Sequence, residues 1–307
     1  MFDETDPRAQ LASSTRGAAA AVDRTDVDHV QCFELAGLAP DDVEAGRPDQ
    51  WSVRGATFVV TYVTAAQGDS EPLADVRDES ILVVEDPSTR LLVSTASQDV
   101  EITEPSVVII PPGAHTITAQ ASGTYVRVVP DHAVEGTPTA RNEDFYADPR
   151  PGTDPVPPAL PEGSTGDVVV HPLSTVHPEA GRFGRIFRSR SLMVNLLEPE
   201  SGPRDTDKLS PHHHNTFEQC SVTLHGDYVH HLRVPWTKRL SQWRDDEHLR
   251  CSSPSITIIP PGMIHTTRSV GEGHHLMMDV FAPARDDFLA MSGWVLNTAD
   301  YPPGDPS

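Results

Sequence analysis

Residues 254–265 read PSITIIPPGMIH, a run of β-branched residues that leads into Pro-Pro-Gly and then a histidine. Nearly the same run, PSVVIIPPG, occupies residues 105–113, so that Pro254 follows Pro105 by 149 positions. Self-similarity at the length of a domain indicates duplication of one fold. We therefore expect two related units, each containing a strand that ends in a tight turn.

Short runs rich in Val and Ile surround both copies and are separated by Asp, Pro, Ser and Gly, which is typical of an all-β fold. The first set of predicted strands covers residues 56–63, 80–84, 90–94, 106–110 and 125–129. The second set covers residues 184–187, 191–197, 217–224, 228–234, 255–259 and 275–281. Residues 286–296 have weaker helical character and are expected to close the second unit.

The distribution of Pro, Gly and apolar residues predicts how the chain divides. Residues 1–25 are polar and Ala-rich and are interpreted as a flexible tail, and residues 26–132 form the first unit. Pro and Gly are so frequent between residues 133 and 166 that no periodic pattern of apolar residues remains, and we interpret this segment as a linker. Residues 167–307 form the second unit.

The formal net charge of −22 argues against nucleic acid as a partner, because binding phosphate backbones normally requires a basic face. The same charge disfavours an anionic membrane surface. The three cysteines form neither a CxxC pair nor a disulfide framework, residues 1–17 lack the basic and apolar regions typical of a leader peptide, and the sequence contains no long apolar run. We therefore expect a cytoplasmic protein without a membrane or nucleic-acid partner.

Residues 210–218 read SPHHHNTFE and contain the densest group of the 15 histidines. In an extended chain alternate side chains share a face, so His212, His214 and Glu218 are expected to point inward while His213 points away. A turn at residues 260–264 would bring His265 across from them. Three imidazoles and one carboxylate suit a divalent transition metal such as Fe, Mn, Ni or Zn.

The pattern HxHxxxE, followed by PxGxxH, resembles the two motifs of the cupin superfamily. The resemblance implies two cupin barrels in tandem and one divalent metal per chain, with iron expected first, held by His212, His214, Glu218 and His265. One departure concerns spacing, since seven residues rather than the usual six separate Glu218 from Gly226. Cupin sheets have edges that commonly pair between chains, so a homodimer is also expected.

The first unit departs further from the cupin pattern. Its second motif ends at His115, one residue short, and residues 73–87, where the first motif is expected, contain no histidine. A metal site cannot be built from His115 alone. We therefore predict that this barrel has lost its site and serves structure, dimerisation or coverage of the second barrel.

Residues of the strand after Gly226 are candidates for catalysis. Tyr228 and His230 share one face and could transfer protons or orient a substrate, although buried structural roles are an equal alternative. Arg233 lies on the opposite face and could bind a substrate carboxylate. Its alternative is an ion pair with a surface acid.

Three functions remain open for a small-molecule substrate that is oxygen-rich or carboxylated. The leading prediction is an iron-dependent dioxygenase, in which substrate and O₂ bind side by side. The second is a non-redox isomerase, lyase or decarboxylase, in which the metal polarises a carbonyl or carboxylate. The third is a ligand-binding sensor, disfavoured because no DNA-binding helical segment is present.

Overall fold

The computed structural model describes residues 27–41, 43–133, 139–150, 152–176, 182 and 184–301. Within these residues the fold is all-β, as predicted, with one short α-helix and several single-turn 3₁₀ helices. The predicted helix over residues 286–296 is shorter than expected, since α2 spans only Asp286–Leu289. No helix in the described part of the chain has the length and apolarity needed to cross a bilayer.

The strands before the midpoint of the chain are β1 (Gln31–Glu34), β2 (Asp49–Arg54), β3 (Phe58–Ala65), β4 (Ser70–Val76), β5 (Ser80–Val84), β6 (Arg90–Thr95), β7 (Asp99–Ile102), β8 (Ser106–Ile110), β9 (Gly113–Ala121) and β10 (Gly123–Pro130). Those after it are β11 (Val169–Pro172), β12 (Gly184–Arg188), β13 (Met193–Leu197), β14 (Glu200–Ser201), β15 (Gln219–His225), β16 (Asp227–Arg233), β17 (Glu247–Ser252), β18 (Ser255–Ile259), β19 (Ile264–Val270) and β20 (His274–Phe281). The 3₁₀ turns are η1 (Leu35–Gly37), η2 (Asp131–Ala133), η3 (Glu143–Tyr146), η4 (Leu173–Thr175), η5 (Leu240–Gln242) and η6 (Thr298–Asp300).

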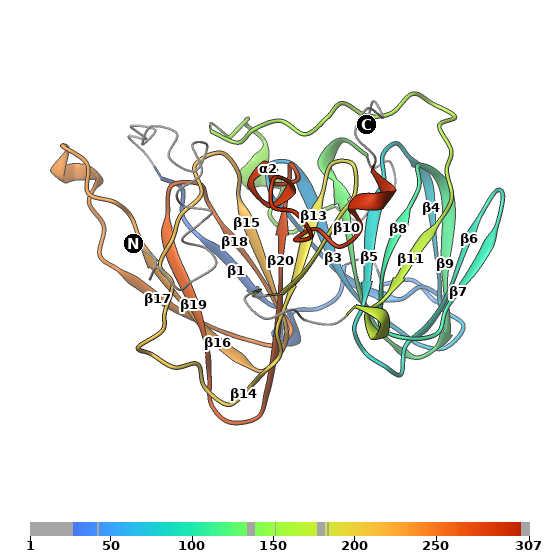
Figure 1. The fold of residues 1–307 in the computed structure, drawn as a ribbon, viewed down its shortest axis with the longest axis horizontal. Helices are drawn as coiled ribbons and strands as arrows, with labels where there is room; N and C mark the ends of the chain where they lie inside the picture. Colours follow the sequence, from blue (N-terminus) through green and yellow to red (C-terminus); the bar gives the residue numbers. More distant parts are fainter. Residues whose placement is uncertain are drawn as a thin grey trace.

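These strands form four sheets that stack as layers across the molecule (Figure 1). A four-stranded sheet, β4-β9-β6-β7, faces a six-stranded sheet, β11-β8-β5-β10-β3-β2. We call this pair the first sandwich. A seven-stranded sheet, β1-β18-β15-β20-β13-β12 with β14 paired to β20, faces a three-stranded sheet, β17-β16-β19. We call this pair the second sandwich.

The two large sheets pack against each other through an apolar core, which joins the sandwiches into one body. Val60 and Val128 of the six-stranded sheet belong to the same buried cluster as Val222 and Val280 of the seven-stranded sheet. Because these central strands are buried on both faces, they are nearly continuous runs of Val, Ile and Leu. The runs at residues 81–84 and 107–110 are the clearest examples.

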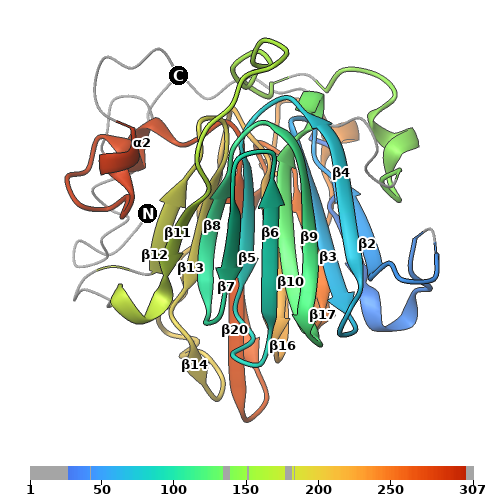
Figure 2. The same ribbon diagram turned by 90° about the vertical axis from the view of Figure 1, so that its right-hand side faces the viewer.

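The sandwiches exchange one strand each, which the linear domain boundaries did not anticipate. β1 comes from the N-terminal part but pairs with β18, and β11 follows the predicted linker but pairs with β8. Leu35 N donates to Pro254 O at 2.9 Å, and Leu173 N donates to Pro105 O at 2.8 Å. The exchange is therefore reciprocal and falls on the duplicated strands, and Figure 2 shows β11 beside β8.

The interiors of the two sandwiches differ in polarity. The first is mostly apolar, with side chains from both of its sheets such as Leu82, Val93 and Ile117, and several of its buried polar groups gather around Glu71. The second carries a polar row across its seven-stranded sheet, because the register aligns five inward-facing residues on adjacent strands. These are Cys32, Thr257, Ser221, Asp279 and Asn195. A buried polar row requires partners, and it leads directly to the candidate site.

Candidate metal centre

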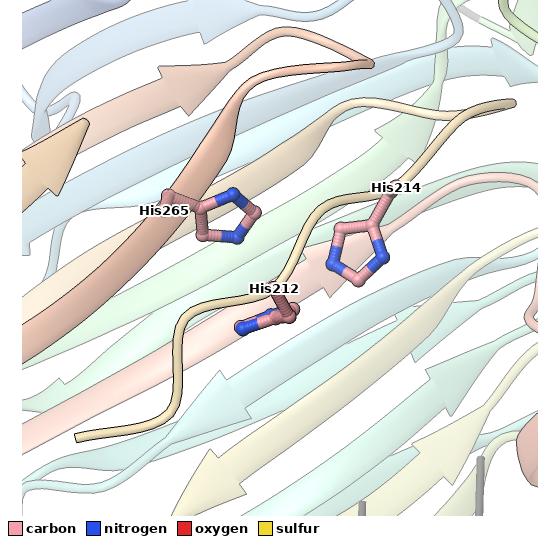
Figure 3. Close-up of side chains that lie close together, drawn as sticks. All are labelled: His212, His214 and His265. Carbon is pink, nitrogen blue, oxygen red and sulfur yellow. The ribbon is translucent and has the colours of Figure 1, made fainter. Parts of the chain in front are cut away.

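Three of the predicted ligands, His212, His214 and His265, lie together at the start of β19 and in the loop before β15 (Figure 3). Their ligand nitrogens all lie within 4.8 Å of one another. The ring centroid of His212 is 4.4 Å from that of His265 and 5.0 Å from that of His214. His213 is exposed, as alternation along an extended segment predicts.

The backbone fixes how these histidines meet. His212 N donates to His265 O at 3.0 Å and His265 N donates to His212 O at 2.7 Å, so the two residues form an isolated antiparallel bridge. Gly262 N donates to His214 O at 2.6 Å. Gly262 has a φ of 85°, a left-handed conformation that glycine adopts without strain. The Pro-Pro-Gly turn therefore holds the loop and β19 together.

Hydrogen bonds determine which ring nitrogen of each histidine is available to a metal. Nδ1 of His212 donates to Ser210 O and Nδ1 of His265 donates to Met263 O, both at 2.9 Å. Burial lowers the pKa of His265 to about 4, so its ring is neutral near pH 7. A carbonyl only accepts, so the single proton sits on Nδ1 and Nε2 presents a lone pair.

Gln219 supplies a fourth candidate ligand, one residue after the glutamate that matches the cupin motif. Its Oε1 lies 3.0 Å from His214 Nε2 and 3.2 Å from His265 Nε2. Oε1 and His265 Nε2 are both acceptors, so neither satisfies the other. A cation shared by these atoms and His212 would satisfy them, and the donor set of three imidazoles and one amide oxygen fits a divalent transition metal.

The amide of Gln219 is oriented by two neighbours in the polar row. Its Nε2 donates to Asp279 Oδ1 at 3.1 Å and to Ser221 Oγ at 3.2 Å. Ser221 Oγ donates to the same Asp279 oxygen at 2.7 Å. Because a carboxylate only accepts, the NH₂ group must face Asp279 and the carbonyl oxygen must face the histidines.

Glu218, the predicted carboxylate ligand, does not join the cluster. Its Oε2 accepts from Ala56 N at 2.6 Å and its Oε1 accepts from the Tyr146 hydroxyl at 3.0 Å. Burial raises the pKa of Glu218 to about 7. Glu218 directly precedes Gln219, the first residue of β15, and the two side chains of this extended segment point to opposite faces of the sheet. Glu218 therefore points toward the first sandwich.

The spacing to Gly226 contained the signal for this correction. Seven residues separate Glu218 from Gly226, whereas six separate Gln219 from it, which is the usual cupin number. The spacing therefore favours Gln219 over Glu218 as the counterpart of the motif's carboxylate. With Gln219 in the fourth position, every candidate protein ligand would be neutral.

Comparisons with known proteins agree with this architecture. No family model and no curated protein matches the sequence. Solved structures match at low identity: an oxalate decarboxylase from Lactobacillus farciminis in a formate complex (14% identity, 84% of this chain and 88% of that chain, TM-score 0.57), Bacillus subtilis oxalate decarboxylase with Mn(II) centres (12%, 85% and 80%, TM-score 0.56) and protein Ylba from E. coli (15%, 86% and 95%, TM-score 0.51). The chain has the cupin fold. Identities this low show a shared fold and leave activity to the site.

The three predicted catalytic residues of this chain occupy different environments. His230 is fully buried in β16 and faces inward, with Nδ1 2.8 Å from Thr267 Oγ1 and Nε2 lacking a hydrogen-bond partner among the described residues. Burial, then the charges of His265 and His231, lowers its pKa to about 3. In the β16–β19 register His265 stands opposite Leu232, and the next inward pair is His230 and Thr267. His230 is therefore the inward neighbour of the histidine cluster.

Tyr228 lies farther along β16 from the cluster, and Arg233, although close to His265 in the register, points to the opposite face. Tyr228 is buried against the ring of His275 at 5.7 Å, and it stands about 13 Å along β16 from Leu232 by strand geometry. Arg233 points outward and forms a two-pronged ion pair with Asp246 at 2.5 and 2.8 Å. Arg233 therefore forms an ion pair with a surface acid, which was the alternative to binding a substrate carboxylate.

His115, the histidine of the first sandwich that aligns with the duplicated motif, has a different setting. It is buried, and its Nδ1 lies 3.2 Å from Gly113 O. The same interior contains a buried ion pair in which Arg127 Nη2 donates to Glu71 Oε1 at 2.7 Å, with further hydrogen bonds to Glu71 from Tyr125 and Gln50. Glu71 is thus fully committed to protein partners.

Proposed function

We propose that this cupin is a metal-dependent enzyme that binds a small carboxylated molecule at His212, His214, His265 and Gln219 and promotes a non-redox reaction, such as decarboxylation or another lyase step. The fold we infer is two cupin barrels, one per sandwich, with the metal in the second. The first barrel, whose buried Glu71 is bonded to Arg127, Tyr125 and Gln50, has a structural role in this proposal.

The observation that carries the proposal is the orientation of Gln219. Three imidazoles and one amide oxygen add no negative charge, so a bound divalent ion would keep its full charge and act as a Lewis acid on a carboxylate. Burial lowers the pKa of both His214 and His265, and the charge of Arg285 lowers both further, second to burial at His214 and after the charge of His213 at His265, so Arg285 adds to the positive potential at the site. Both features favour an anionic substrate over a neutral one.

His230 gives the site a group for proton transfer. Its ring is neutral near pH 7 because burial opposes the charged form, and Thr267 holds the ring through Nδ1. The unpartnered Nε2 faces the same interior as His265. The lowered pKa makes the free imidazole a weak base, and an anionic substrate beside the ring would raise this pKa, which would let Nε2 accept or return a proton as lyase and isomerase reactions require.

The histidine cluster is partly open to solvent, as a binding site for a small substrate requires. His265 and Gln219 are buried, whereas His212 and His214 are each partly exposed. The cluster therefore lies at the opening of the second sandwich, with its polar row below. The solved structures named as decarboxylases support the lyase alternative over the dioxygenase prediction, and the Mn(II) centres named for one of them make Mn²⁺ the first ion to test.

The test combines metal content with turnover. The purified chain, stripped with chelator and reloaded with Mn²⁺ or Fe²⁺, is assayed with oxalate and a panel of small carboxylates, with and without O₂. We expect CO₂ release or proton exchange with Mn²⁺, no O₂ uptake, and loss of metal in His265→Ala. His213→Ala is the matched control, because His213 is exposed, and it should keep both metal and activity. O₂ consumption coupled to turnover with Fe²⁺ would instead identify an oxygenase.

A further inference from the structure

A second cluster of metal-binding side chains lies where the two sandwiches meet. Glu85 directly follows β5 of the first sandwich, His225 ends β15 and His274 begins β20. One ligand atom from each of the three lies within 4.8 Å of the other two. Glu85 Oε2 is 2.9 Å from His225 Nε2, and the rings of His225 and His274 are 5.4 Å apart.

We propose that Glu85, His225 and His274 form a second transition-metal site, suited to a borderline ion such as Zn²⁺. Two imidazoles and one carboxylate are a common ligand set for Zn²⁺, with a water in the fourth position. The side chains of His225 and Glu85 are 48% and 25% exposed, so an ion can reach them from solvent. A small cavity of about 20 Å³ beside Glu85 and His225 has room for one water.

The local backbone indicates that these three side chains do more than form an ion pair. The β15–β20 pairing shifts register between Thr223 and His225, so that His225 lies opposite Leu276. Such a bulge redirects a side chain at the end of a strand. An ion pair with Glu85 needs only one imidazole, yet the shift places His274 beside His225 as well.

This site is separate from the centre that contains Gln219. Gln219 and His225 are the first and last residues of β15, so about 20 Å of strand separates them. The two sites would therefore bind ions independently, and the second does not rest on the proposed catalytic function. Its ligands come from both sandwiches, so an ion bound there would tie them together and stabilise the folded chain.

Zn²⁺ titration of the full chelator-stripped chain by calorimetry tests the proposal. We expect two equivalents in the unmodified chain, one in His274→Asn and one in His265→Ala, with none in the double variant. Zn²⁺ should raise the Tm of His265→Ala but not of the double variant. The matched control is His171→Asn, which removes another surface His–carboxylate pair, formed with Asp300 at 2.9 Å, and should still bind two equivalents.

Glu85→Gln provides a milder second variant that should fold in every case, since Glu85 lies at a partly exposed strand end. It should weaken binding at this site and leave the Gln219 centre unchanged. An unchanged Zn²⁺ count in both His274→Asn and Glu85→Gln would overturn the second site. Loss of metal at the Gln219 centre alone would contradict the proposed function and leave this inference intact.

Discussion

Asp279 Oδ1 accepts a hydrogen bond from Gln219 Nε2 at 3.1 Å, and this contact decides which end of the Gln219 amide faces the histidines. Gln219 is an amide whose two ends have similar size but opposite hydrogen-bonding character. Without an obligate acceptor behind it, the amide could present NH₂ to the cluster and repel a cation. Asp279 is therefore a positioning residue for the centre.

Replacing Asp279 with Asn tests this role. An asparagine can donate to Gln219 Oε1, so the amide is free to turn its NH₂ group toward the histidines. We expect Mn²⁺ or Zn²⁺ affinity to fall about 10- to 100-fold, the usual effect of losing a group that orients a ligand. Competition with a chelating dye measures the affinity. Ser221→Ala, which leaves Asp279 in place, should have a smaller effect, and equal affinities in all three proteins would refute the assignment.

The choice between Gln219 and Glu218 gives a second prediction. Gln219→Ala removes the proposed ligand and should release most of the metal, whereas Glu218→Gln should retain it. In Glu218→Gln the amide oxygen can accept from Ala56 N, and the amide NH₂ group can donate to the Tyr146 hydroxyl oxygen. Both groups that contact Glu218 therefore keep a hydrogen-bond partner. Elemental analysis of the two variants, each checked for folding by circular dichroism, decides the matter. The reverse pattern of metal loss would restore Glu218 as the ligand.

Much of the fold was predictable because the central sheets are buried on both faces. β5, β8 and β18 match their predicted ranges fully, since each is a short run dominated by Ile, Leu and Val between turn residues. Several strands of the outer sheets escaped prediction. β9 reads GAHTITAQA and β19 reads IHTTRSV, and in both the polar residues of the solvent-facing side hide the strand period.

The candidate site was predictable in part. Alternation placed His212 and His214 on one face and excluded His213, and the PxG motif located His265. The fourth candidate ligand was missed because a one-residue shift at the start of β15 exchanges Glu218 for Gln219 across the sheet. The strand exchange by β1 and β11 left no sequence signal, because pairing partners far apart along the chain are chosen by tertiary packing.

Replacing His230 with Gln tests whether this residue transfers protons. His230→Gln keeps a polar side chain of similar size but cannot act as a base at Nε2. We expect metal content to stay unchanged and kcat on any active carboxylate to fall about 10²- to 10⁴-fold, the usual contribution of general acid–base catalysis. Arg233→Gln serves as the control, because its guanidinium pairs with Asp246 at the surface, and it should leave kcat and KM unchanged. Full activity in His230→Gln would assign His230 a purely structural role.

A fourth prediction concerns stability and pH at the seam between the sandwiches. Asp131 and Asp78 raise the pKa of His132 from its ordinary value near 6.5 to about 9, and Asp78 also pairs with Arg190 at 3.1 Å. A raised folded-state pKa stabilises the protein fully below pH 6.5, and this stabilisation is lost as the pH rises through 9. Because His132 is 25% exposed and partly screened, we expect a loss of about 1 to 2 kcal/mol in the free energy of unfolding between pH 6.5 and 9.5. Urea titrations of His132→Gln should lack this decrease, whereas the exposed control His248→Gln should retain it, and identical pH profiles for both variants would show that His132 is not responsible.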